Sequence, residues 1–187
     1  LKQMMFFVGE ENFKKGIRNY LKKFSNKNTE LNDFLNSMSE VSGEDINKWS
    51  KQWLETTGVN TIKSEVVNKV CIVTQSPSIN NNQLRDHVIQ YELYKVLQNK
   101  PKIVDEGKVY IKDSMSKFKI KENGDFLLLN ARDHDYIKIL FSEKDFEFIS
   151  DHISHIESRF TRRIIWGNLW QMVRDNILCP IKFLSLI

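Results

Sequence analysis

The fold of this chain is decided by the stretch Ser42-Gly-Glu-Asp-Ile-Asn-Lys-Trp-Ser-Lys-Gln-Trp-Leu-Glu-Thr-Thr-Gly58, which holds half of the tryptophans. Ile46, Trp49 and Trp53 recur at i, i+3 and i+7, so they would line one stripe of a helix. The glycine at the end of the stretch is expected to terminate that helix at its C′ position. The following residues, 59–66, alternate as a strand does. The stretch is therefore predicted to be a helix between a helical region and a β region, with both indoles wedged between them.

Residues 1–58 are predicted to form four helices, because apolar residues recur at helical spacing and polar or glycine-containing breaks separate them. Thr29 is expected to cap the third helix. Connections of a few residues imply antiparallel neighbours in a compact bundle. The chain opens at Leu1 without a methionine, so we expect its natural start to lie upstream and the first helix to have lost an apolar neighbour. The predicted apolar stripes before the tryptophan helix are Leu1, Met4, Met5 and Val8; Phe13, Ile17, Tyr20, Leu21 and Phe24; and Leu31, Phe34, Leu35 and Met38.

Residues 59–132 change to the period of two that is typical of strands. Turn-forming residues separate the short alternating runs, notably around Pro77, at Lys100-Pro101, at Asp105-Glu106-Gly107 and around Gly124. No segment is long enough for a crossover helix, which favours an antiparallel sandwich over a parallel sheet. We predict six or seven strands, with segments at Val70–Thr74, His87–Leu93, Ile103–Val104, Val109–Ile111, Phe118–Ile120 and Phe126–Leu129.

Residues 133–187 return to a helical period. Ser142, followed three residues later by Asp145, is expected to cap a first helix, and a second helix would run from Phe160 to Val173. An apolar helical hairpin of this kind is typical of the start of a larger array. The sequence thus predicts an α+β multi-domain fragment: a helical bundle (1–58), an antiparallel β-sandwich (59–132) and the start of an α-helical, HEAT-like array (133–187).

The composition is that of a globular protein, with 41% hydrophobic and 11% aromatic residues, and it excludes a disordered chain. The net charge of +4 arises from interleaved signs, which argues against a nucleic-acid-binding module. Cys71 and Cys179 are too few for a disulfide framework or a zinc site, and this low usage favours a cytoplasmic protein. No apolar run reaches the length of about 18 residues that a membrane span needs.

The candidate metal ligands include four histidines, His87, His134, His152 and His155. His152 and His155 lie three residues apart beside Asp151 and could hold a metal from one helix face. No further ligand has the spacing of an H-E-x-x-H site, so we interpret this segment as a solvated helix face. Asp133-His134-Asp135 is interpreted as an acidic turn between domains rather than a binding site.

Other chemically suggestive residues have structural explanations. Gly9-Glu10-Glu11-Asn12 superficially resembles the G-x-M-E-N strand of aminopeptidases, but it lacks the methionine and opens a helix, where acidic residues favour the dipole. The tryptophan pairs at i and i+4 could stack a ligand, but such pairs are more typical of a core. The lysines of residues 14–27 would form the solvent-exposed face of the second helix. These residues are Trp49, Trp53, Trp166 and Trp170, and Lys14, Lys15, Lys22, Lys23 and Lys27.

Several segments together resemble one family, in its order and over nearly the whole chain. They are Leu1-Lys2-Gln3, Val8–Phe13 with Gly16, Arg18 and Tyr20; Ser42–Asp45, Trp49, Trp53 and Thr57–Asn60; Leu127–Asp133 with Tyr136; and Arg159–Arg163, Trp166–Trp170 and Met172–Asp175. The family that they resemble is that of zinc aminopeptidases of the aminopeptidase N type. The first two groups resemble the end of its catalytic domain, the third its passage from a β domain to a helical domain, and the last its early C-terminal helices.

The resemblance implies an enzyme that removes N-terminal residues from peptides. In this family zinc, held by an H-E-x-x-H helix and a downstream glutamate, activates water, while a second glutamate binds the free amine and a tyrosine stabilises the oxyanion. All of these groups would lie upstream of Leu1, so we assign no catalytic, cofactor-binding or metal residue in this chain. We predict that the chain alone binds no zinc and cleaves nothing. It would give structural support to an intact enzyme, with the upstream catalytic domain as its partner. The alternative is a non-enzymatic β-sandwich and helix scaffold for protein–protein interaction.

Overall fold

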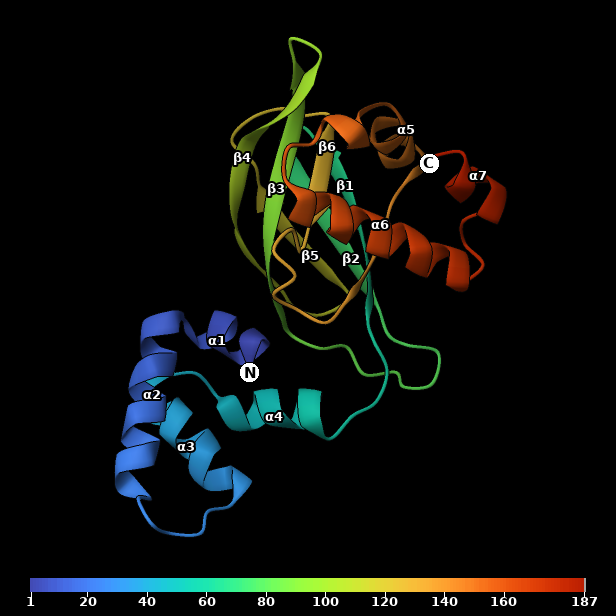
Figure 1. Cartoon of the computed structure of the whole chain (residues 1–187). Helices are drawn as coiled ribbons and strands as arrows, with labels where there is room; N and C mark the ends of the chain where they lie inside the picture. The colour runs from blue at the N-terminus through green and yellow to red at the C-terminus, as the bar shows by residue number, and fades with distance from the viewer. Residues whose placement is uncertain (187) are drawn as a thin grey trace.

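The computed structural model describes residues 1–186, and its first part is the predicted set of four helices. They share a core of six buried apolar side chains, among them Met38, Ile46 and Trp49. Gly16 allows α2 to approach α3 closely, since a Cβ there would lie 2.6 Å from Met38 Sδ. Figure 1 shows this unit at one end of the strands. The helices are α1 (Lys2–Val8), α2 (Glu10–Lys23), α3 (Leu31–Ser42) and α4 (Ile46–Leu54).

Three local predictions in this unit are wrong. The cap of α3 is Glu30, which forms a capping box with Asp33, while the Thr29 hydroxyl instead lies 2.6 Å from that of Tyr20. Leu21 is 61% exposed, so the apolar stripe of α2 is narrower than its sequence indicates. Gly58 is not the C′ residue, because α4 ends at Leu54. It adopts a φ of +88° in the loop beyond, a conformation that favours glycine.

Seven strands follow and form two small sheets that are mostly antiparallel. The sheet in the order β5-β2-β1-β7 contains β1 (Thr61–Val67), β2 (Val70–Ser76), β5 (Met115–Lys119) and β7 (Lys138–Leu140). The sheet in the order β4-β3-β6 contains β3 (His87–Leu97), β4 (Lys100–Ile111) and β6 (Phe126–Leu129).

The strand boundaries differ from the predicted ones at two places. The runs at Ile103–Val104 and Val109–Ile111 are one strand, β4, because Asp105-Glu106-Gly107 pairs with β3 instead of turning. The turn lies earlier, at Gln98 and Asn99, which both have positive φ. β7 lies where helix was expected from residue 133, and it pairs parallel with β1. Its backbone continues the sheet between the turn that follows β6 and the start of α5.

The C-terminal helices pack with both sheets into one apolar core. The predicted cap of α5 is confirmed: Ser142 Oγ accepts from Asp145 N, and the Asp145 carboxylate accepts in return from Ser142 N. In the core, Phe126 of β6 stacks on Phe148 of α5 with centroids 4.9 Å apart. Trp170, expected in a core, is 53% exposed and lies against Phe183. These elements are α5 (Glu143–His152), the 3-10 helix η1 (Ile153–His155), α6 (Arg159–Arg174) and α7 (Pro180–Leu184), on one flank of the strands in Figure 1.

Candidate functional site at the junction of helices and strands

Arg85 ties the C-terminal end of α4 to the strands. It lies just before β3, is only 2% exposed, and donates from Nε to the Gln52 carbonyl oxygen at 2.8 Å. Its Nη2 donates to Thr56 Oγ1 at 2.6 Å and to the Thr57 carbonyl oxygen at 2.8 Å, while the guanidinium lies over the Trp53 ring. Burial lowers the pKa of the Arg85 guanidinium, and the charge of nearby Asp135 opposes that shift. The planar fork of arginine is suited to joining several backbone acceptors in this way.

Asp135 joins three separate parts of the chain. One carboxylate oxygen accepts from Gln3 Nε2 of α1 at 2.5 Å and from Tyr136 N at 2.7 Å. The other accepts from Val88 N of β3 at 3.2 Å and lies 3.2 Å from His87 Nδ1. Because Asp135 and His87 are both almost fully buried, this carboxylate needs these partners. It therefore fixes α1, β3 and the turn after β6 relative to one another.

The turn that carries Asp135 is closed by Asn130. Asn130 Oδ1 accepts from the backbone N–H groups of His134 and Asp135, and its Nδ2 donates to the Asp135 carbonyl oxygen at 2.9 Å. Asn130 and Asp133 both have positive φ, a conformation that asparagine and aspartate tolerate better than most residues. The acidic turn predicted from the sequence is thus a rigid, internally bonded loop.

The half-buried His134 also connects this turn to α1. Its ring stacks on Phe6, with centroids 3.8 Å apart and planes 6° from parallel. Lys2 of α1 donates to the carbonyl oxygens of Arg132 and Asp133. Burial, and next the charge of Lys2, lower the pKa of His134. His134 is therefore favoured in its neutral, stacked form.

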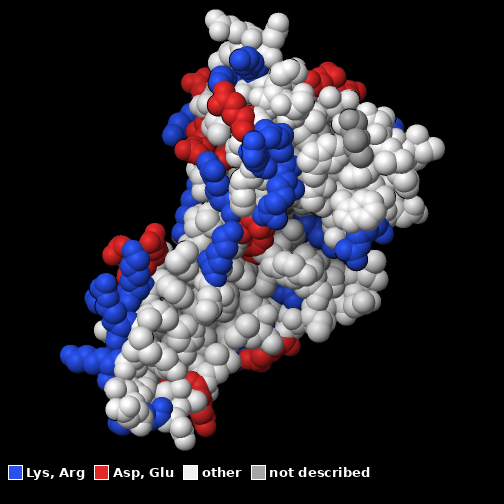
Figure 2. Space-filling model, viewed as in Figure 1, with Lys and Arg blue, Asp and Glu red and all other residues white. Residues whose placement is uncertain are grey.

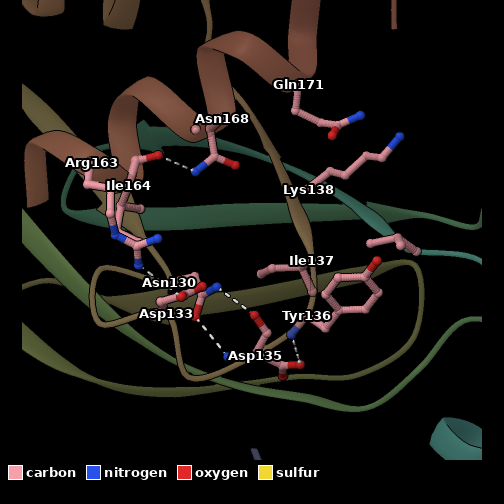
Figure 3. A pocket seen from close by; sticks show the side chains of 12 residues that line it. Asn130, Asp133, Asp135, Tyr136, Ile137, Lys138, Arg163, Ile164, Asn168 and Gln171 are labelled. Carbon is pink, nitrogen blue, oxygen red and sulfur yellow. Dashed lines mark hydrogen bonds and ion pairs between the residues drawn. The ribbon is translucent and has the colours of Figure 1, made fainter. Parts of the chain in front are cut away.

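A polar pocket of about 250 Å³ lies between this turn and α6, as Figure 3 shows. Its charged side chains are already paired: Arg163 Nη2 lies 3.2 Å from Asp133 Oδ2, and Lys138 Nζ lies 2.6 Å from Asp175 Oδ2. The hydrogen bond from Lys138 lowers the pKa of Asp175. The face shown in Figure 2 likewise has basic and acidic side chains next to each other. With no unpaired charge at its centre, the pocket is suited to holding the turn against α6 rather than to acid–base chemistry.

The histidines do not form a metal centre. His152 ends α5 and lies against Phe148, whereas His155 lies in the following 3-10 helix and is exposed, so the two are not on one helix face. His87 pairs with Asp135 and His134 stacks on Phe6. Within residues 1–186 there is no group of three or more potential ligands placed to hold a metal ion. No helix in that range is long and apolar enough to cross a membrane.

Sequence reasoning missed the roles of Arg85 and His87. Their partners lie more than 20 residues away along the chain, from Gln52 to Asp135, so no short spacing reveals them. The one available signal is that the polar run Arg85-Asp86-His87 stands at the start of β3, a strand that mixes apolar residues with Gln90 and Glu92. Trp49 and Trp53 are core residues of the helical unit, as predicted, and Trp53 also lies edge-on to His87.

Comparisons with known proteins agree with this fold. Residues 1–53 match the peptidase family M1 domain. Over its whole length the chain is 30% identical to "Aminopeptidase N" of Streptomyces lividans, of which it covers 24%. "Leucyl aminopeptidase" of Saccharolobus solfataricus is 42% identical over 37% of this chain and 9% of that protein.

A solved structure of similar fold is that of Legionella pneumophila aminopeptidase A in complex with aspartic acid. It matches 99% of this chain and 22% of its own, with a TM-score of 0.70 and 16% identity, which shows a common fold. The chain spans about a quarter or less of the length of these relatives. It therefore belongs to the M1 peptidase family and corresponds to a portion of an aminopeptidase of the aminopeptidase N type.

Proposed function

We propose that this chain is a non-catalytic frame of a zinc-dependent aminopeptidase that removes N-terminal residues from peptides. In this proposal residues 1–58 complete the catalytic domain, 59–132 form a β-sandwich domain, and 133–187 begin a HEAT-like helical domain. The family match and the whole-length similarity to an aminopeptidase N support it. The zinc of the intact enzyme and its peptide substrates would be bound by an upstream catalytic domain, and this chain would contribute no catalytic, cofactor or metal residue.

The observation that carries this proposal is the buried polar junction. The helical unit and the strands have separate apolar cores, and Arg85 and Asp135 connect them through directional hydrogen bonds. Hydrogen bonds to buried charges are strong and fix geometry more sharply than apolar contacts do. A frame that must hold a catalytic domain at a set angle to the rest of an enzyme needs this property.

The proposal is tested by assaying the 187-residue chain itself. We expect purified chain to contain no stoichiometric zinc after dialysis and to hydrolyse no aminoacyl-fluorophore, while circular dichroism shows it folded. Zinc content is measured by atomic emission, and hydrolysis is measured with and without a chelator. Turnover that the chelator abolishes would mean that this chain holds its own catalytic metal, and the proposal would then be abandoned.

A further inference from the structure

A second, larger cavity lies beside the end of β7, where Leu140, Phe141 and Ser142 line it. Its volume is about 890 Å³, within the range of ligand sites, and its lining is mostly apolar. Leu93 and Phe126, both almost fully buried, belong to the sheet β4-β3-β6, and the half-exposed Ile177 follows α6. Ser64 and Val66 of β1 also line it. The cavity is thus bordered by the edge of one sheet and by apolar side chains of the other.

The edge of β1 is only partly covered. β7 pairs with β1 over Thr61–Lys63, and the outer side of β7 is closed by Asn168 of α6, whose Oδ1 accepts from Ile139 N at 3.1 Å. β7 ends at Leu140, yet β1 continues from Ser64 to Val67 with a partner on the β2 side alone. The cavity runs beside this uncovered length.

The register shows which main-chain groups face the cavity. Val67 and Val70 flank a two-residue turn, so their pair exchanges hydrogen bonds, as do alternate pairs along the hairpin. Ser64 and Val66 lie between those pairs and direct their main-chain groups toward the other edge. In residues 1–186 no hydrogen bond reaches the main-chain N–H or C=O of Val66 from that side. An unpaired edge of this kind is a template for another strand.

We propose that this cavity binds an extended peptide segment, which adds to the sheet alongside Ser64–Val67 in line with β7. Only a peptide backbone offers donors and acceptors at the spacing of the exposed edge. Alternate side chains of the added strand would face inward over Leu93 and Phe126, which favours an apolar residue there. The others would face outward beside Glu65, which favours a cationic one. The site needs neither zinc nor catalysis and so goes beyond the proposed function.

The test uses the 187-residue chain and the probe peptide acetyl-Thr-Val-Lys-Val-Thr-amide, whose valines would face inward and whose lysine would face outward. Saturable shifts of the amide signals of Ser64–Val67 in NMR spectra are expected, together with signals from residues around Phe126. A probe with the same side chains but N-methylated at the central amides is expected to bind at least about tenfold more weakly, because it cannot complete the ladder.

Two variants separate main-chain pairing from side-chain contact. Val66→Pro removes the N–H that points out of the β1–β2 ladder, and edge positions tolerate proline. It is expected to weaken binding of the probe about tenfold or more, whereas the matched Val66→Ala, which keeps the N–H, is expected to stay within about threefold. Unchanged circular dichroism would show that both variants fold. If Val66→Pro does not fold, main-chain pairing is tested by comparing the binding of the N-methylated and unmethylated probes to the unchanged chain.

Three results would overturn the proposal: equal binding of the methylated probe, shifts that map elsewhere, or no saturable binding. A fourth is self-association, in which the same amides shift with chain concentration alone and sedimentation shows a dimer. That result would mean that the edge pairs with a second copy instead.

Discussion

Replacing Asp135 by asparagine tests whether the junction depends on a buried carboxylate. The amide oxygen can still accept from Gln3 and Tyr136, but the NH₂ group would face the N–H of Val88 and leave it unpaired. An unpaired buried donor costs about 1–3 kcal/mol, and losing the charge weakens the two remaining bonds by about 1 kcal/mol each. Asparagine avoids the cost of desolvating a charged carboxylate, which offsets part of this loss of stability. We expect Asp135→Asn to lower the free energy of unfolding by about 1–3 kcal/mol and Asp135→Ala by about 3–5 kcal/mol.

The assay is urea unfolding followed by tryptophan fluorescence, for which Trp53 is a local reporter beside His87. The midpoint should fall with an unchanged slope. Asp133→Asn is the matched control, because Asp133 lies in the same turn, is exposed and makes an ion pair with Arg163, worth about 0–1 kcal/mol. If Asp135→Asn were as stable as the control, the carboxylate would not hold the junction, and the reasoning that makes this chain a frame would fail with it.

Three further outcomes follow from the same contacts. Arg85→Lys keeps the charge but loses the planar fork, and should lower the free energy of unfolding by about 2–4 kcal/mol; a loss below about 0.5 kcal/mol in urea unfolding would refute its bridging role. Since His134 has a lowered pKa in the folded chain, the unfolded chain binds more protons, so stability is complete above the ordinary pKa of 6.5 and falls as pH drops through the folded pKa. His134→Phe keeps the stack on Phe6 and should flatten that dependence when unfolding midpoints at about pH 7.5 and pH 5 are compared. Gly58→Ala would place a Cβ in a clash with Ser78 Oγ at a φ of +88°, and calorimetry should show a lower Tm; Ser78→Gly should relieve the clash but not the backbone strain.

The order of helices, strands and helices could be predicted because periodicity is a local signal. It identified the four N-terminal helices and the cap at Ser142, since each depends on residues within a few positions. It failed at Lys138–Leu140, which is too short for its own period to be read and becomes a strand only by pairing with β1. It also failed at Asp105-Glu106-Gly107, where β3 imposes strand structure on a turn-like sequence.

The candidate site was harder to predict than the fold for a related reason. A buried aspartate and an exposed one have the same sequence signature, and Asp133 and Asp135 stand two positions apart in one turn. The two aspartates differ in their hydrogen-bond donors. Gln3 of α1 and the N–H of Val88 in β3 both donate to the Asp135 carboxylate and not to that of Asp133. These contacts join residues that are far apart in the sequence, so no motif with a fixed spacing predicts them and only the folded structure reveals them.

Buried carboxylates recur in the β region, and Glu92 and Asp135 draw their donors from different parts of the chain. Glu92 accepts from the Tyr94 hydroxyl at 2.6 Å and lies 2.9 Å from Arg132, both close to it in the β region. Asp135 instead draws its donors from α1 and β3. Replacing a buried charge inside one unit disturbs that unit, but replacing Asp135 disturbs the angle between two. A buried charged group adds little stability compared with apolar packing, so the placement of the Asp135 carboxylate at the junction is better explained by fixed geometry than by added stability.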